Sequence, residues 1–195
     1  ATYLIEQLKA EEFAEIPPED FFYSTGSIVQ EGILNVPGFP YGKFYYWKNP
    51  ATKNGESAKH FGGNFGGKAA GNDLIIFISN AQPDLAKADD YSKRIIYVAS
   101  GFKVKTIISF AAMPQAIDHT QQSKVWFTAT SKEIINILMK HNFELLSEGQ
   151  ISGMNGLFLG IAKKEGFDGL CLLGEIPLYT IQIENPKASY AVLDA

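Results

Sequence analysis

The chain has 195 residues, which is enough to bury one full hydrophobic core, so we expect a single domain covering residues 1–195. Hydrophobic residues make up 46% and charged residues 19%, a composition that excludes disordered and collagen-like proteins. The formal net charge of -4 argues against nucleic-acid binding, because a basic face for phosphates is missing.

The sequence also lacks the signals that direct a protein to a membrane or out of the cell. No apolar run reaches the length of a membrane span, and no basic stretch followed by an apolar one marks a signal peptide. The single cysteine, Cys171, cannot form an internal disulfide. We therefore expect a soluble cytoplasmic protein.

The N-terminal third predicts one helix followed by short strands. Leu4, Ile5 and Leu8 share one helical face without a convincing cap, so we expect that a first strand lies upstream of Ala1. Prolines and glycines then separate three short extended segments typical of a meander or hairpin at a sheet edge. These segments are Glu12 to Ile16, Asp20 to Thr25 and Ser27 to Leu34.

An aromatic strand and a long polar loop follow. Residues Gly42 to Lys48 include four consecutive aromatic side chains, which favour a strand. The segment Asn49 to Asn72 is rich in glycine, asparagine, lysine and serine, and we expect it to be the least ordered or least buried long segment.

From Asp73 onward, strands and helices alternate. Thr130 and Glu133 have the spacing of a capping box, Gly101 is expected to cap a helix in the left-handed conformation, and Pro186 is suited to a first helical position. The expected strands are Leu74 to Ser79, Val104 to Phe110, Lys124 to Thr128, Phe143 to Leu146, Phe167 to Leu173 and a short piece at Ile181 and Ile183. The expected helices are Ala88 to Ala99, one with its apolar face at Ile134 to Met139, Asn155 to Lys164, and one from Pro186 that we expect to continue beyond Ala195.

This alternation predicts an α/β fold with three layers, in which helices cover both faces of a mixed, largely parallel sheet. The early strands make the sheet mixed, and the later crossovers of helical length make most of it parallel.

A turn with two glycines is the first candidate binding feature. Gly153, Asn155 and Gly156 lie just before or in the first turn of an expected helix, where backbone N–H groups attract anions. The turn lacks the lysine and hydroxyl residues of a phosphate-binding loop. We favour the structural interpretation, in which the glycines allow a tight turn and close packing of the helix on the sheet.

Glu175 is the second candidate, because it follows an apolar strand at the edge where open α/β folds bind ligands. Asn80 and Gln82 follow another strand and are expected to line a cleft with it. The alternative is that the Glu175 carboxylate organises the turn before Pro177 or lies in a subunit contact.

No catalytic, metal or cofactor site is expected from the remaining residues. His60 lies in the polar loop, His119 follows an aspartate in an expected turn, and His141 ends a helix. Cys171 is centred in an apolar strand, as expected for a buried small hydrophobe. No His, Cys, Asp or Glu residues have the spacing of metal ligands.

The segment Gln150 to Tyr179 contains an Ile-x-Gly-x-x-Gly turn at Ile151, a Cys-Leu-Leu-Gly-Glu-x-Pro motif ending at Pro177, and Tyr179. With this pattern it resembles the second proteasome assembly chaperone family. Asn185 to Ala188 also fit the pattern. The resemblance implies a phosphorylase- or nucleoside-hydrolase-like fold and assembly into homo-oligomers or pairs with a related subunit.

The sequence is compatible with two functions, a scaffold and an enzyme. The resemblance implies a non-catalytic oligomeric scaffold that binds itself or a related subunit, with proteasome core subunits as possible partners. The alternative is a small-molecule enzyme of phosphorylase or nucleoside-hydrolase type, with a cleft near Glu175. A ligand touching Glu175 favours the enzyme, whereas an oligomer that covers this edge favours the scaffold.

Overall fold

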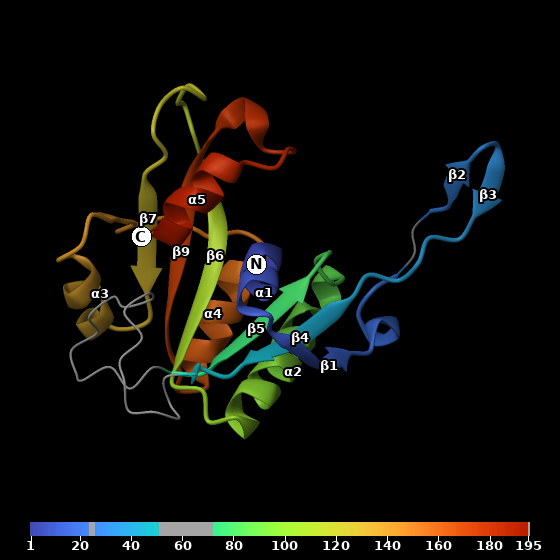
Figure 1. Ribbon diagram of the computed structural model, residues 1–195, viewed down its shortest axis with the longest axis horizontal. Helices are drawn as coiled ribbons and strands as arrows, with labels where there is room; N and C mark the ends of the chain where they lie inside the picture. The colour runs from blue at the N-terminus through green and yellow to red at the C-terminus, as the bar shows by residue number, and fades with distance from the viewer. Residues whose placement is uncertain (24–25, 51–71, 195) are drawn as a thin grey trace. The chain divides into compact units, whose positions relative to one another are not determined.

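The computed structural model describes residues 1–23, 26–50 and 72–194. Its contacts divide the chain into two compact units, Ala1–Ile95 and Ile96–Ala195, which are described separately below. Helix α2 (Ala88–Gly101) runs across the boundary in sequence. Figure 1 labels the elements in chain order.

Unit 1 contains a three-stranded antiparallel sheet in the order β1-β4-β5. Its strands are β1 (Glu11–Ile16), β4 (Gly42–Trp47) and β5 (Leu74–Ser79), and helix α1 (Thr2–Leu8) precedes them. Aromatic rings form its core, in which Phe44 and Tyr91 are fully buried. The ring centroids of Phe44 and Phe77 are 4.7 Å apart, and Phe21 contacts Tyr91 edge-on with centroids 5.0 Å apart. The aromatic strand expected from the sequence is therefore confirmed as β4.

A separate two-stranded hairpin also belongs to unit 1. Strands β2 (Ile28–Gln30) and β3 (Ile33–Asn35) pair with each other, and with no other strand of the described residues, through a two-residue turn at Glu31 and Gly32. Both turn residues have positive φ, 51° and 83°. This matches the twist of an antiparallel hairpin, which favours two left-handed residues in so short a loop.

Unit 2 contains a four-stranded mixed sheet in the order β6-β9-β7-β8. Its strands are β6 (Thr106–Gln115), β7 (Val125–Ala129), β8 (Glu144–Leu145) and β9 (Asp168–Pro177). The β6–β9 and β7–β8 pairs are parallel, whereas β7–β9 is antiparallel. An α/β fold with a mixed, partly parallel sheet is thus confirmed.

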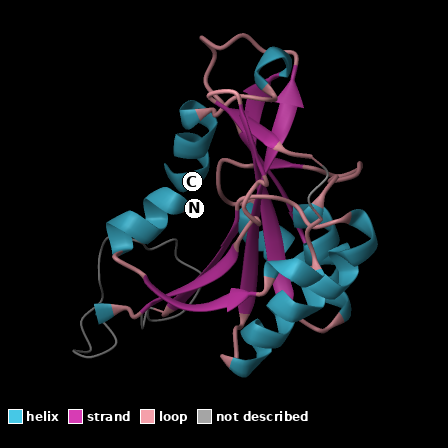
Figure 2. Ribbon diagram, turned by 90° about the vertical axis from the view of Figure 1, so that its right-hand side faces the viewer, coloured by secondary structure: helices cyan, strands magenta, loops and turns pink. Residues whose placement is uncertain are grey.

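Helices pack on both faces of the unit 2 sheet (Figure 2). These helices are α3 (Lys132–Leu138), α4 (Met154–Lys164) and α5 (Pro186–Asp194). A Cβ on Gly169 would meet Leu159 of α4, and a Cβ on Gly174 would meet Ala188 of α5. Because residues 169 and 174 differ in parity along one strand, α4 and α5 lie on opposite faces.

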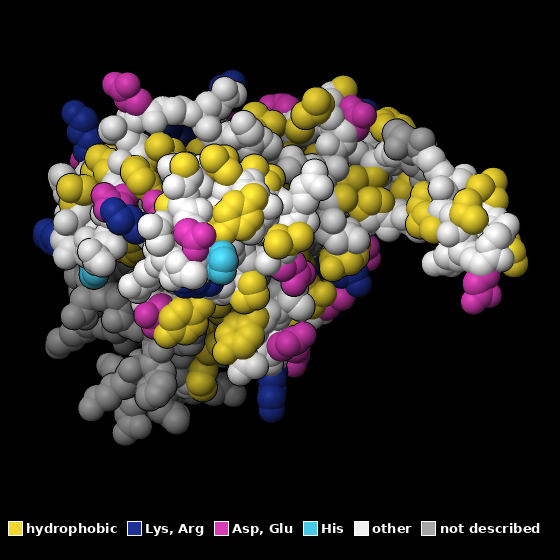
Figure 3. Space-filling model, turned by 90° about the horizontal axis from the view of Figure 1, so that it is seen from above, with side chains coloured by type: hydrophobic (Ala, Val, Ile, Leu, Met, Phe, Trp, Pro, Cys, Tyr) yellow, Lys and Arg dark blue, Asp and Glu magenta, His cyan; other side chains and the backbone are white. Residues whose placement is uncertain are grey.

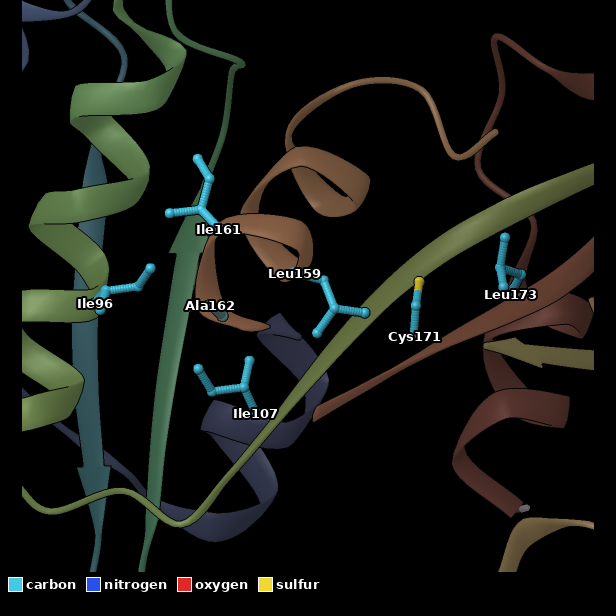
Figure 4. Packing of buried hydrophobic residues seen from close by; sticks show 7 residues of the cluster. All are labelled: Ile96, Ile107, Leu159, Ile161, Ala162, Cys171 and Leu173. Carbon is cyan, nitrogen blue, oxygen red and sulfur yellow. The ribbon is translucent and has the colours of Figure 1, made fainter. Parts of the chain in front are cut away.

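Figure 4 shows the larger hydrophobic cluster of unit 2. Leu159 and Ala162 of α4 pack beside Ile107 of β6 and Cys171 and Leu173 of β9. Cys171 is completely buried, and burial raises the pKa of its thiol. The prediction that it is a buried small hydrophobe is confirmed.

Several element boundaries were predicted wrongly. In place of the strand Asp20 to Thr25 there is a 3-10 helix, η1 (Pro18–Asp20), and residues 24–25 lie outside the described part. The polar loop falls mainly on residues 51–71, which also lie outside it. Ile181 and Ile183 form no strand; they follow the 3-10 helix η4 (Leu178–Thr180).

The capping predictions also need correction. Gly101 still belongs to α2, and the left-handed residue is Lys103, with φ 55°. Ser131, rather than Thr130, caps α3 and accepts a hydrogen bond from the Ile134 amide. The Thr130 hydroxyl instead accepts a hydrogen bond from the Gly169 amide at 2.9 Å, which links β7 to β9. Pro186 begins α5 as predicted.

Candidate functional site

Glu175 lies inside strand β9, whereas the sequence placed it in a turn beyond the strand. Strand β9 continues to Pro177 because its pairing with β6 extends to that residue. The Glu175 side chain is 6% exposed. The expected turn after Leu173 is therefore wrong, and the carboxylate is part of the sheet.

Both carboxylate oxygens of Glu175 accept hydrogen bonds from β7 and the residue before it. The indole Nε1 of Trp126 donates to Oε1 at 2.7 Å, and the backbone N–H of Lys124 donates to Oε2 at 3.2 Å. The Glu175 amide in turn donates to the Lys124 carbonyl at 3.0 Å. These bonds satisfy a buried charge and hold the end of β7 against β9.

Lys124 has a second carboxylate partner, on β8. Its Nζ donates to Glu144 Oε1 at 2.9 Å, and this hydrogen bond is the main reason why the lysine pKa is raised. The charge of Glu144 adds to the shift, and the charge of Glu175 adds less. Lys124 thus contacts Glu175 with its backbone and Glu144 with its side chain, joining three strands at one sheet end.

The glycine turn before α4 is built from local contacts. Gly153 caps the helix with φ 76°, a conformation that favours glycine. A Cβ on Gly156 would collide with the Ile151 backbone and lie 2.8 Å from the Ile151 Cβ. Asn155 Nδ2 donates to the Phe110 carbonyl of β6 at 2.5 Å. Gly153 and Gly156 therefore shape the turn that begins α4, and Asn155 joins the helix to β6.

Asn80 and Gln82 lie at the end of β5 in unit 1. The Asn80 side chain accepts a hydrogen bond from the Tyr41 amide at 2.8 Å, and the Asn80 amide donates to the Tyr41 carbonyl at 3.3 Å. Gln82 is exposed. Because Glu175 belongs to unit 2, a common cleft with these two residues stays a prediction.

Tyr179 contacts a loop that the sequence did not connect with it. Its hydroxyl accepts a hydrogen bond from the His119 amide at 2.9 Å and lies 3.0 Å from His119 Nδ1. Lys187 Nζ donates to the carbonyls of His119 and Thr120, at 3.1 and 3.0 Å, and to that of Gln121. The loop between β6 and β7 is thus held by η4 and by the first turn of α5.

The Asn185-Pro186-Lys187 motif gains a physical explanation from these contacts. The Asn185 side chain accepts a hydrogen bond from the Ala188 amide at 3.0 Å and caps α5. Pro186 occupies the first helical position, which leaves Lys187 facing the loop carbonyls. In that loop, hydrogen bonds from Thr120 to Asp118 lower the pKa of the aspartate, so a tight turn is present where one was expected.

The partners of the candidate residues could not be identified from the sequence. Trp126 and Tyr179 find their partners 49 and 60 residues away along the chain. Neither Trp126 nor His119 has neighbouring residues that suggest such a contact, and only the family pattern drew attention to Lys187. Across the described ranges, no group of three or more His, Cys, Asp or Glu residues is arranged to hold a metal ion.

The comparisons with known proteins agree on one family and one fold. A model described as the PAC2 family matches residues 1–195. An uncharacterised protein of Methanocaldococcus jannaschii is 32% identical over 106 residues, which are 54% of this chain and 35% of that protein. The chain thus spans about a third of the length of this curated relative.

Two solved structures are similar in fold. A proteasome activator from Pyrococcus furiosus has a TM-score of 0.72 and 24% identity, covering 98% of this chain and 73% of that one. A proteasome-assembly chaperone homologue from Mycobacterium tuberculosis has a TM-score of 0.73 and 16% identity, covering 99% of this chain and 74% of that one.

In the described residues, no helix combines the length and apolar character needed to cross a bilayer.

Proposed function

The chain belongs to the PAC2 family, and from this premise we propose that it is a non-catalytic, self-associating binding protein of the proteasome-assembly type. Its partners in this proposal are further copies of itself or a related subunit, and proteasome core subunits, in the cytoplasm. The observation that carries the proposal is the family match over residues 1–195. The similarity in fold to the archaeal proteasome activator and to the mycobacterial proteasome-assembly chaperone homologue supports the choice of partner.

The surroundings of Glu175 support the non-catalytic part of the proposal. A catalytic carboxylate faces a concave site within reach of a second functional group. The two oxygens of Glu175 instead accept hydrogen bonds from the Trp126 indole and the Lys124 backbone, and the side chain is buried in the sheet. These contacts favour the structural interpretation over the phosphorylase or nucleoside-hydrolase alternative.

The proposed fold is one three-layer domain of phosphorylase type that contains both units. Helices on both faces of the unit 2 sheet support such an arrangement. Asn80 and Gln82 are proposed as part of a protein-binding edge of unit 1, and Glu175 and Tyr179 as part of one in unit 2. Gly153, Asn155 and Gly156 are proposed to shape the unit 2 edge through α4.

The proposal is tested by mixing the chain with the proteasome core α subunits of its own organism and measuring the mass of the products by light scattering. We expect a complex heavier than either component. Failure to form one at tens of micromolar would contradict the proposed partner.

Glu175→Gln separates the scaffold from the enzyme, because the amide keeps the shape and removes the charge. Phosphorolysis and hydrolysis of a nucleoside panel are measured on the unchanged chain and the variant. The scaffold interpretation predicts no activity in either protein above the rate without protein. Activity that the substitution removes, with the unfolding midpoint and mass retained, would establish the enzyme instead.

A further inference from the structure

The β2–β3 hairpin exposes an unusual amount of apolar surface. Its five large aliphatic side chains are between 47% and 82% exposed. They are Ile28, Val29, Ile33, Leu34 and Val36. Figure 3 shows hydrophobic side chains over much of the hairpin surface.

The apolar side chains occupy both faces of the hairpin. Val29 lies opposite Leu34 in the ladder, and side chains alternate between faces along each strand, so Val29, Leu34 and Val36 share one face. Ile28 and Ile33 belong to the other face by the same alternation. An ordinary surface hairpin would bury one face on its own core and present polar groups on the other.

Apart from its short strands and one charge, the hairpin has none of the usual features that prevent unwanted association. Between Gly26 and Gly42 the only charged residue is Glu31, in the turn. Exposed strand edges in stable monomers normally carry charges or are covered. In the described part of the chain neither strand pairs with the other sheets, and an isolated two-stranded hairpin is marginally stable in water. This segment therefore has the properties of a surface that another protein covers.

We propose that the hairpin is an exchange arm, which docks on a second copy of this chain while the arm of that copy docks in return. This inference rests on the self-association proposed above and specifies the element that produces it. The argument for a second copy comes from the area available.

A fully exposed aliphatic side chain offers about 100 Å² of apolar area, so the five together offer roughly 300 Å². With the matching surface of a partner, one arm would bury roughly 600 Å², which is below the 1,200 to 2,000 Å² of specific interfaces. In a dimer with two-fold symmetry both arms make the same contact, so the total buried area is about 1,200 Å². Reciprocal exchange between copies thus reaches a sufficient area where one arm on a different protein does not.

Leu34→Asp and Val29→Asp test the proposal, with Leu85→Asp as the matched control. Leu85 is 90% exposed in η3 (Leu85–Lys87), outside the hairpin, and its substitution adds the same charge. Masses are measured by analytical ultracentrifugation between about 1 and 100 µM. We expect the unchanged chain and the control to have at least twice the chain mass of 21.5 kDa, and both hairpin variants to dissociate at concentrations at least tenfold higher.

Two further measurements show whether each variant is folded and whether the hairpin is covered. Near-ultraviolet circular dichroism of Trp47 and Trp126 shows whether each variant is folded, and hydrogen exchange reports the protection of the amides from Ile28 to Asn35. We expect these amides to be protected in the unchanged oligomer and to exchange rapidly in the variants.

Hairpin variants that keep the mass of the unchanged chain would overturn the arm and leave self-association standing. An unchanged chain of 21.5 kDa at every concentration would overturn both, whereas binding to proteasome subunits is decided by its own assay. Variants that lose only the binding of a different protein would also overturn the exchange arm.

Discussion

Gly156→Ala should destabilise the protein, although alanine is the better helix former. A Cβ at this position would lie 2.8 Å from the Ile151 Cβ and still closer to the Ile151 carbonyl oxygen. Carbon atoms in contact are normally 3.5 to 4.0 Å apart, so α4 must move away from the preceding turn by nearly 1 Å.

The magnitude follows from two opposing effects. Overpacking of this kind costs about 1–3 kcal/mol, and more when backbone atoms must move. Replacing a helical glycine with alanine stabilises by up to about 1 kcal/mol. Because the obstacle here is backbone rather than the end of a flexible side chain, we expect a net loss of about 2 kcal/mol.

Gly160→Ala is a control in the same helix. A Cβ there meets nothing within 4 Å, so only the gain in helix propensity of about 0.5–1 kcal/mol should remain. The two variants should therefore change stability in opposite directions, by roughly 3 kcal/mol relative to each other.

Urea unfolding followed by the fluorescence of Trp126 measures both variants. Equal stability of the two proteins would show that the contact between Gly156 and Ile151 does not restrict the helix. A Gly156→Ala protein that stays stable but loses binding of inorganic phosphate would restore the anion-site interpretation of this turn.

Three other predictions concern hydrogen bonds of Glu175, Lys187 and Asp73, each within one unit. Glu175→Ala leaves the indole of Trp126 and one backbone N–H without an acceptor and should lower the free energy of unfolding in urea by about 2–4 kcal/mol. Lys187→Met should speed amide hydrogen exchange in residues 119–121 and cost about 1 kcal/mol, because an exposed cation contributes little beyond its hydrogen bonds. The pKa of Asp73 is lowered, chiefly by the hydrogen bond from the Tyr46 hydroxyl. The stability from this contact is therefore fully present above the ordinary aspartate pKa and is lost as the pH falls through the lowered pKa of Asp73. An NMR titration of the Tyr46 ring should show this loss.

Each of these predictions has a control. Glu175→Gln keeps one carbonyl acceptor and should lose less stability than Glu175→Ala; equal losses would show that the hydrogen bonds are not the cause. Lys163→Met removes the same charge from the last turn of α4 and should leave exchange in residues 119–121 unchanged. In Asp73→Asn the acidic step in the Tyr46 signal should vanish; its persistence would assign the step to another group.

The sequence was sufficient for elements whose signals are local. Pro186 placed the start of α5 correctly because proline suits the first helical position. The apolar pattern from Leu74 to Ser79 gave the bounds of β5, although β5 pairs antiparallel with β4 and the pattern suggested a parallel strand. A run of apolar residues indicates a strand but says little about the direction of the neighbouring strand.

The candidate site could not be predicted from local signals, because it depends on contacts between residues far apart in the sequence. Glu175 was expected to leave the sheet because a carboxylate in a strand is costly, but hydrogen bonds from the Trp126 indole and the Lys124 amide stabilise it there. Thr130 was expected to cap a helix, but its hydroxyl bonds to Gly169 of the neighbouring strand. In both cases tertiary contacts outweighed a sound local preference.

The central claim, that this PAC2 family chain binds proteasome core subunits as a self-associated protein, is tested most directly by native mass spectrometry of the chain mixed with the α subunits of its own organism. We expect complexes that contain two or more copies of the 21.5 kDa chain together with α subunits. Spectra in which the chain and the α subunits remain separate at tens of micromolar, under conditions that preserve the α-subunit assemblies, would contradict the claim.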